Sequence, residues 1–176
     1  MSPEEIIEAW DSENKRALKL GSWYHKQRED ELLAGQTLQR EGIDLPIFNI
    51  IEQDGVKLAP DQNLVSGIYP EHMVYLKSAK ICGQADRVEI VNNKVNIYDY
   101  KTNKEIKTES YKNWEGVHKM MLAPINHVQD CNLMHYALQL SIYMYIILKH
   151  NHSFQPGRSD ERRVGKECRS RWSAEH

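Results

Sequence analysis

Apolar and polar residues alternate along two stretches, residues 80–91 and 94–102, which flank the pair Asn92-Asn93. A period of two predicts β-strands, because successive side chains of a strand point to opposite faces. Asparagine tolerates the left-handed backbone that a two-residue hairpin loop requires. The pattern therefore predicts a β-hairpin with Asn92-Asn93 as its loop.

The register of this hairpin brings charged side chains together at the end away from the loop. With a two-residue loop, Asp86 lies directly opposite Asp99, and facing residues of an antiparallel pair have Cβ atoms ~5 Å apart. Lys101 shares the face of Asp99, because it lies two residues further along the strand. The sequence thus predicts a charged trio of two carboxylates and one ammonium on one sheet face.

The charged trio continues an apolar face of the hairpin. The apolar residues of that face are Val88, Ile90, Val95 and Ile97. A charge on a face that packs against the core is costly unless it is paired or binds a metal ion. This cost is the main physical reason to interpret the trio as functional.

Two stretches have the apolar spacing of helices. The first opens with Ser2-Pro3-Glu4-Glu5, in which Ser2 and Glu5 form a capping box, and it ends near Leu33, with Gly35 as the expected C-cap. Gly21 either interrupts this helix or is absorbed by it. The second, residues 133–150, is apolar on most sides and is expected to be buried, with Asn132 or Asp130 as its cap.

The rest of the chain completes an α/β fold. Residues 71–76 form a candidate strand before the hairpin, whereas residues 36–63 contain Gly and Pro punctuation and predict a connecting region. We expect one domain over residues 1–156, with a central mixed sheet flanked by the amino-terminal helix and the helix of residues 133–150.

The composition restricts the class of protein. No apolar run approaches the ~20 residues that cross a membrane, and the acidic amino terminus is unlike a signal peptide. The three cysteines lack metal-ligand spacing and cannot all pair, which favours a reducing compartment. The net charge of -2 gives no global attraction to nucleic acid, so any such binding needs a local basic patch.

The carboxyl-terminal residues differ in kind. Residues 158–172 carry dense, mixed charge without helical or strand periodicity, and they resemble the translation of a common sequencing-library adaptor. We expect residues 157–176 to be a non-native, disordered tail after an interrupted reading frame, which would leave the domain over residues 1–156 truncated. A natural basic tail is the alternative.

Four motifs occur in order along the chain: Gly21-Ser22-Trp23-Tyr24-His25, Gly83-Gln84-Ala85-Asp86, Tyr98-Asp99-Tyr100-Lys101-Thr102 and Gln139-Leu140-Ser141-Ile142-Tyr143. Together they resemble the RecB-like exonuclease branch of the PD-(D/E)XK nuclease superfamily. A softer similarity over residues 124–143 is to phage-encoded members. The resemblance implies a restriction-endonuclease-like core.

The resemblance also implies roles for individual residues. His25, Asp86, Asp99 and the backbone carbonyl of Tyr100 are the expected ligands of a divalent metal ion, with Asp86 and Asp99 counted among the catalytic residues. Lys101 is expected to orient or activate the attacking water.

Other residues are implied to bind DNA or to support the site. Gln139 and Tyr143 would do so from the second helix, and Glu71 and Lys104 from the sheet and the segment after it. Three of them also have an ordinary structural interpretation: Glu71 and Lys104 are typical solvated charges, and Gln139 is a candidate for a structural hydrogen bond.

The chemistry is consistent with phosphodiester hydrolysis. The reaction needs neutralised phosphate charge, an activated water and a stabilised leaving oxygen, which one or two Mg²⁺ or Mn²⁺ ions supply. Carboxylate and carbonyl oxygens suit these ions, and one imidazole is compatible with Mn²⁺.

We therefore expect a metal-dependent DNA exonuclease that acts on linear DNA ends in recombination or repair, in the cytoplasm of a bacterial or phage-infected cell. The alternatives are a nucleic-acid-binding domain of this fold that does not cleave, and a restriction-type endonuclease.

Overall fold

The computed structural model describes residues 2–102, 105–163 and 166–168. Its helices and sheet strands are α1 (Pro3–Leu33), β5 (Gly67–Leu76), β6 (Ile81–Val91), β7 (Lys94–Lys101), α2 (Asn132–His150), β8 (Gln155–Arg163) and β9 (Lys166–Cys168). Two short hairpins, β1 (Thr37–Arg40) with β2 (Ile43–Pro46) and β3 (Glu52–Gln53) with β4 (Val56–Lys57), precede β5. A 3₁₀ turn, η1 (Lys77–Ala79), joins β5 to β6.

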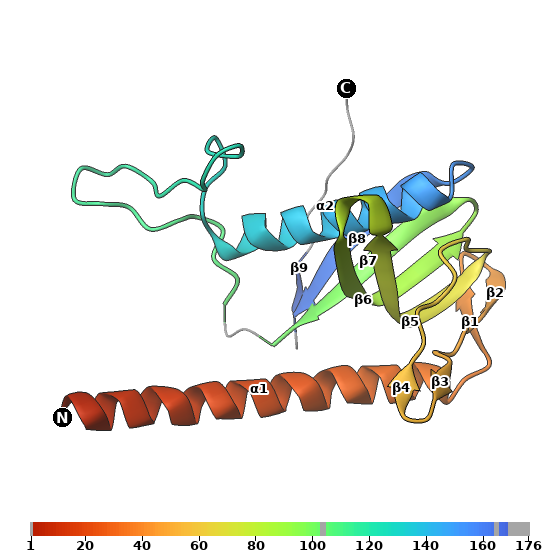
Figure 1. Cartoon of the computed structure of the whole chain (residues 1–176), viewed down its shortest axis with the longest axis horizontal. Coiled ribbons are helices and arrows are strands. Elements are labelled where there is room, and N and C mark those ends of the chain that lie inside the picture. Colours follow the sequence, from red (N-terminus) through yellow and green to blue (C-terminus); the bar gives the residue numbers. More distant parts are fainter. Residues whose placement is uncertain (1, 103–104, 164–165, 169–176) are drawn as a thin grey trace.

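The sheet has the order β5-β6-β7-β8-β9 and is mixed, because β7 and β8 are parallel and the other neighbours are antiparallel. In Figure 1 the sheet lies between α2, above it, and α1, below it. This arrangement confirms the expected α/β class, with a central mixed sheet flanked by helices. Within the described part of the chain, no helix combines the length and apolar character needed to span a membrane.

The β6–β7 hairpin has the expected loop and register. Asn92 and Asn93 have φ angles of 50° and 60°, the left-handed conformation of a two-residue loop. From the loop, the paired residues run from Val91 opposite Lys94 to Arg87 opposite Tyr98. The local pattern therefore predicted this hairpin correctly.

Both faces of the hairpin are buried. The apolar face packs against α2 in a core that includes Val88, Ile90, Val95 and Ile97, none of them exposed. On the opposite face, Glu89 accepts two hydrogen bonds from Arg40 Nε, each 3.1 Å long, and lies 3.1 Å from Arg87 Nε. A buried carboxylate needs such partners.

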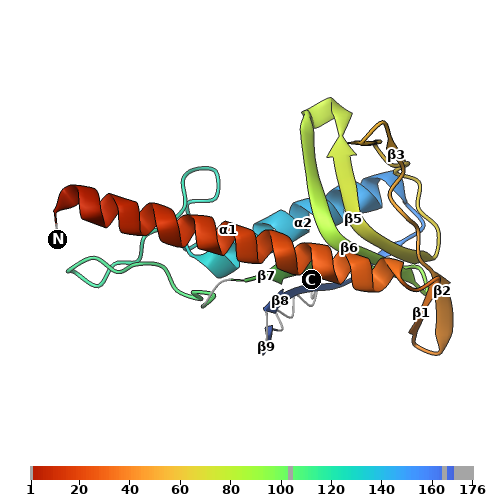
Figure 2. The same cartoon turned by 90° about the horizontal axis from the view of Figure 1, so that it is seen from below.

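Helix α1 is continuous from Pro3 to Leu33. Its capping box is formed as predicted: Glu5 N–H donates to the Ser2 hydroxyl, and the Ser2 N–H donates to the Glu5 carboxylate. Gly21 does not interrupt the helix, and the C-cap is Ala34 rather than Gly35. Figure 2 shows that the carboxyl-terminal half of α1 crosses the sheet while its amino-terminal half extends past it.

The cap of α2 differs from the prediction. Cys131 is the N-cap residue and makes no side-chain cap hydrogen bond, and Asn132 is already helical. The Asp130 carboxylate lies 2.7 Å from both Lys119 Nζ and His135 Nε2. These two partners occupy the side chain that was expected to cap the helix.

The described residues of the expected tail lie in strands, and the non-native origin of residues 157–176 stays a prediction. Residues 157–163 continue β8 beside β7, and β9 pairs with the end of β8. Backbone hydrogen bonding to an open strand edge depends little on side-chain pattern, which explains why the side-chain pattern gave no sign of these strands. Residues 164–165 and 169–176 lie outside the described part of the chain.

Candidate active site

Three neighbouring strands bring three carboxylates into one row. The β5–β6 pairs on either side of Glu71 place it opposite Asp86. Continuing the β6–β7 register by one residue places Asp99 opposite Asp86 from the other side. The sequence predicted the second relation, whereas the first depends on the register of β5.

The regular ladders are interrupted at this row. Counted from the loop, the pairing of β6 with β7 ends at Arg87 and Tyr98, one position short of Asp86. On β5, Glu71 has a φ of 48°. A long side chain in the left-handed region is strained, and such strain is found most often at functional sites. The Asp86 carboxylate accepts the Tyr100 N–H at 2.5 Å, which ties the carboxylate to the backbone of β7.

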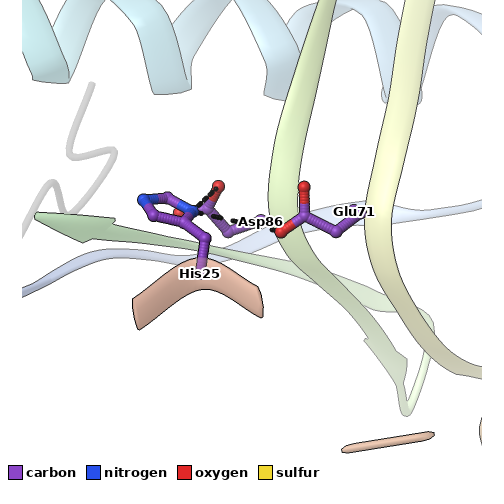
Figure 3. Close-up of side chains that lie close together, drawn as sticks. All are labelled: His25, Glu71 and Asp86. Atoms are coloured by element: carbon purple, nitrogen blue, oxygen red, sulfur yellow. Dashed lines mark ion pairs between the residues drawn. The ribbon is translucent and has the colours of Figure 1, made fainter. Parts of the chain in front are cut away.

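Helix α1 adds an imidazole to the row. His25 Nδ1 lies 3.1 Å from Asp86 Oδ1 and 4.0 Å from Glu71 Oε1. One ligand atom from each of these three residues lies within 4.8 Å of the others, and Figure 3 shows the side chains converging from α1, β5 and β6. We call His25, Glu71 and Asp86 the ligand group.

Aromatic contacts seat α1 at this position. The rings of Tyr24 and His25 meet the Tyr100 ring edge-on, with centroids 6.0 Å and 6.3 Å apart. A Cβ at Gly21 would lie 3.6 Å from Thr102 Oγ1, an ordinary contact distance. The glycine of the first motif is therefore not required for the approach of the helix to β7.

Asp99 and Lys101 form a separate ion pair beside the ligand group. Lys101 Nζ lies 2.5 Å from Asp99 Oδ2 and 4.5 Å from the centre of the Tyr136 ring. The predicted charged trio is thus divided: Asp86 faces His25 and Glu71, while Asp99 faces Lys101. The expectation that Asp99 is a metal ligand stays a prediction.

Burial and the Asp86 charge raise the pKa of two carboxyl groups of the row, Glu71 and Asp99. Burial, reinforced by the Asp86 charge, raises the pKa of Glu71 to about 7. Burial and Asp86 likewise raise the pKa of Asp99, more than the Lys101 ammonium lowers it. Carboxylates so placed favour a bound cation, which compensates their charge.

The pKa values of the two basic groups beside the row, His25 and Lys101, are both raised. A hydrogen bond with Asp86 is the main cause of the raised pKa of His25, against the effect of burial. Burial lowers the pKa of Lys101, but Asp99 and Asp86 outweigh burial, and the net shift is upward. Lys101 therefore stays an ammonium at neutral pH, as expected from the sequence.

The fourth motif, residues 139–143 on α2, packs against β6. A Cβ at Gly83 would lie 2.4 Å from Tyr143 Cε1, so only glycine leaves room for this ring against the strand. Gln139 Nε2 donates to the Tyr143 hydroxyl at 2.9 Å. Tyr143 is buried. The pair therefore supports the strand that carries Asp86, which fits the site-supporting alternative for both residues.

The remaining predicted residues have different outcomes. Glu71, expected to bind DNA or support the site, belongs to the ligand group. The Tyr100 contribution that the structure describes is its N–H and its ring, and the role of its carbonyl stays a prediction. Lys104 lies outside the described residues.

Sequence reasoning missed Tyr136. It precedes Gln139 by three residues and Tyr143 by seven, a spacing that places all three on one side of α2. That helical spacing was the available signal. Its ring covers the Lys101 ammonium, and such a cation–π contact is worth about 0.5–2 kcal/mol.

Comparison with known proteins adds one match. The model of the PD-(D/E)XK nuclease superfamily matches residues 2–171. No curated protein and no solved structure matches the chain.

Proposed function

The chain belongs to the PD-(D/E)XK nuclease superfamily, and we propose that it is a divalent-metal-dependent DNA exonuclease of the RecB-like type that acts in recombination or repair. Membership suggests a nuclease and therefore a nucleic-acid substrate. The four ordered motifs support the RecB-like assignment, and with it a preference for linear DNA ends. The similarity over residues 124–143 supports a phage-type member of the family, which would act in the cytoplasm of a bacterial or phage-infected cell.

The observation that carries the proposal is the ligand group next to an acid–lysine pair. His25, Glu71 and Asp86 supply one nitrogen and two carboxylate donors within 4.8 Å. This donor set fits Mn²⁺ and, through its oxygens, Mg²⁺. When bound, such an ion neutralises phosphate charge and lowers the pKa of a coordinated water.

The chain's own residues then have distinct tasks. Asp86 is held by the Tyr100 N–H, so its second oxygen keeps a fixed direction toward His25. Lys101, fixed between Asp99 and the Tyr136 ring, can hold a water or steady the negative charge that develops on phosphate oxygens.

The test is incubation of linear and circular DNA with the protein in Mg²⁺, in Mn²⁺ and in EDTA. We expect loss of linear DNA from its ends with either metal, none in EDTA, and intact circles. Cleaved circles would indicate a restriction-type endonuclease. Binding of DNA without cleavage in either metal would favour the non-cleaving domain.

Two variants separate the mechanism from contamination. Asp99→Ala and Lys101→Ala should each lower cleavage by about 10²- to 10³-fold, the usual cost of losing a group that stabilises transition-state charge. Lys94→Ala is the matched control, because Lys94 is exposed at the opposite end of the same strand. Full activity in Asp99→Ala would refute the proposed site.

A further inference from the structure

A cavity of about 360 Å³ lies between β5 and the segment that connects β2 to it. Both Figure 1 and Figure 2 show the β3–β4 hairpin of this segment beside β5. The walls include the apolar side chains of Phe48, Ile51, Leu58, Tyr69 and Met73. Its size and apolar character are those of a small-ligand pocket.

One wall of the cavity is a built aromatic platform. The Phe48 and Tyr69 rings stack with centroids 4.7 Å apart and an angle of 14° between them. A Cβ at Gly67 would lie 2.3 Å from Phe48 Cε2, so the strand residue beneath the ring leaves the space that the stack requires. Phe48 remains 37% exposed, which leaves ring surface open to a ligand.

The cavity adjoins the ligand group at Glu71. Glu71 lines the cavity and is also a member of that group. Gln84, a further lining residue, donates from Nε2 to Glu71 Oε2 at 2.5 Å. Glu71 thus has one side toward the cavity and its carboxylate near His25.

A cation and an unsatisfied polar group add to the lining. Lys57 lines the cavity, and its Nζ lies 3.9 Å from Glu29 Oε1. His72 lines it as well, is 4% exposed, and its Nε2 has no hydrogen-bond partner among the described residues. A buried polar atom of this kind favours a ligand that carries donors or acceptors on its edge.

We propose that this cavity receives one nucleobase of the substrate strand, next to the phosphate that is cleaved. The inference rests on the proposed nuclease function and names its substrate class. A nucleotide combines a flat ring, which stacks on aromatic side chains, with an anion, which suits Lys57 and a metal at the ligand group. Because a paired base cannot enter a cavity, the substrate is single-stranded DNA or a frayed duplex end.

The test uses single-stranded oligonucleotides in which one abasic nucleotide is moved along the strand. Single-turnover cleavage in Mg²⁺ or Mn²⁺ gives the rate of each product. We expect a pause at one fixed offset from the abasic position, with the rate there about tenfold lower, since base–aromatic stacking carries about this weight. Equal rates at every offset would overturn the inference.

Two variants locate the effect in the cavity. Phe48→Ala removes the platform, and Leu58→Glu places a carboxylate in the lining at a position that is 41% exposed. Each should slow cleavage of normal DNA about tenfold. Each should also abolish the additional pause at the abasic position, because the missing base and the altered cavity remove the same contact between base and cavity. Tyr145→Ala, at an exposed aromatic residue of α2, is the control and should keep the wild-type rate and pause.

The two proposals fail differently. Absence of metal-dependent cleavage by the intact protein refutes the nuclease function; the same oligonucleotides are then compared by equilibrium binding in Ca²⁺. Affinity that drops about tenfold at one abasic position, and only when Phe48 is present, supports the cavity. Affinity that is equal for all of them, or a Phe48→Ala variant that behaves like Tyr145→Ala, overturns it.

Discussion

Helices α1 and α2 lie on opposite sides of the same sheet but are attached to it by different forces. Helix α2 has 19 residues and buries five of them, Leu140, Tyr143, Met144, Ile146 and Ile147. Helix α1 has 31 residues and buries none. Its described contacts with the site include the edge-on rings at Tyr100 and the ion pairs of His25 with Asp86 and Glu71.

The difference separates folding from chemistry. Burial of apolar surface on α2 supplies stability at roughly 25 cal/mol per Å², whereas α1 contributes His25 to the ligand group and no buried residue to the core. Residues that contact α2 should therefore control the free energy of unfolding. Residues of α1 that face the site should control activity instead.

The largest effect is expected at His25. His25→Ala removes one member of the ligand group, and cleavage in Mg²⁺ or Mn²⁺ should fall by about 10²- to 10³-fold. The Tm should stay within about 2 °C of wild type, because the ring is not part of the core and alanine favours the helix. Nuclease assays and thermal melts measure the two quantities on the same sample.

His152→Ala is the control for this comparison, since His152 is an exposed histidine in the turn after α2. It should change neither activity nor Tm. A His25→Ala variant with a strongly lowered Tm would show that α1 contributes to folding and would remove the proposed contrast between the helices.

The two motif glycines give the next largest effect. Gly83→Ala places a Cβ 2.4 Å from the Tyr143 ring and should lower the free energy of unfolding by about 1–3 kcal/mol. Gly21→Ala places a Cβ 3.6 Å from Thr102 Oγ1 within a helix and should raise it by about 0.4–1 kcal/mol. Urea titrations of both variants measure the difference, and a loss of stability in Gly21→Ala would contradict it.

These cases also show which parts of the molecule are predictable from sequence. The register between β6 and β7 followed from a local period and a loop of two asparagines. The placement of Asp99 beside Asp86 needed nothing else. The register of β5 passes through η1 and a left-handed Glu71, which no period indicates, so the place of Glu71 in the ligand group was not predictable in this way.

His25 illustrates a different limit. It lies 61 residues before Asp86 on a helix with no buried residue, so apolar periodicity could not place it at the sheet. The resemblance of its motif was the only signal. Cys131 as the α2 cap was missed because Asp130 is engaged by Lys119 and His135, contacts that depend on the tertiary fold.

The ionisable groups at the site next to α1 should make the stability of the protein depend on pH. In metal-free protein, the raised pKa values of Glu71 and His25 mean that the folded state binds their protons more tightly than the unfolded state. Their contribution is fully present below the unfolded pKa and is lost as pH rises through the folded pKa. Stability in EDTA should therefore fall between pH 4.5 and about 7 on account of Glu71.

Thermal melts in EDTA from pH 4.5 to 8 measure this dependence. The Glu71 contribution is on the order of 1–3 kcal/mol, and Glu71→Gln should remove it. Glu41→Gln, at an exposed position of the β1–β2 turn, should retain it. Added Mn²⁺ should raise the Tm more at pH 8 than at pH 5, because protons compete for the same ligands, and an equal rise at both values would argue against a metal at this group.

The smallest effect is expected at the Gln139–Tyr143 hydrogen bond. Tyr143→Phe keeps the ring against Gly83 and removes the hydroxyl to which Gln139 donates. The free energy of unfolding should therefore fall by about 0.5–1.5 kcal/mol. A double-mutant cycle with Gln139→Leu should give a coupling energy of similar size. Cleavage by folded Tyr143→Phe should stay within about threefold of wild type, because the pair reaches Asp86 only through β6. A loss of cleavage far larger than the loss of stability would mean that Tyr143 contacts DNA after all, and α2 would then share the chemistry with α1.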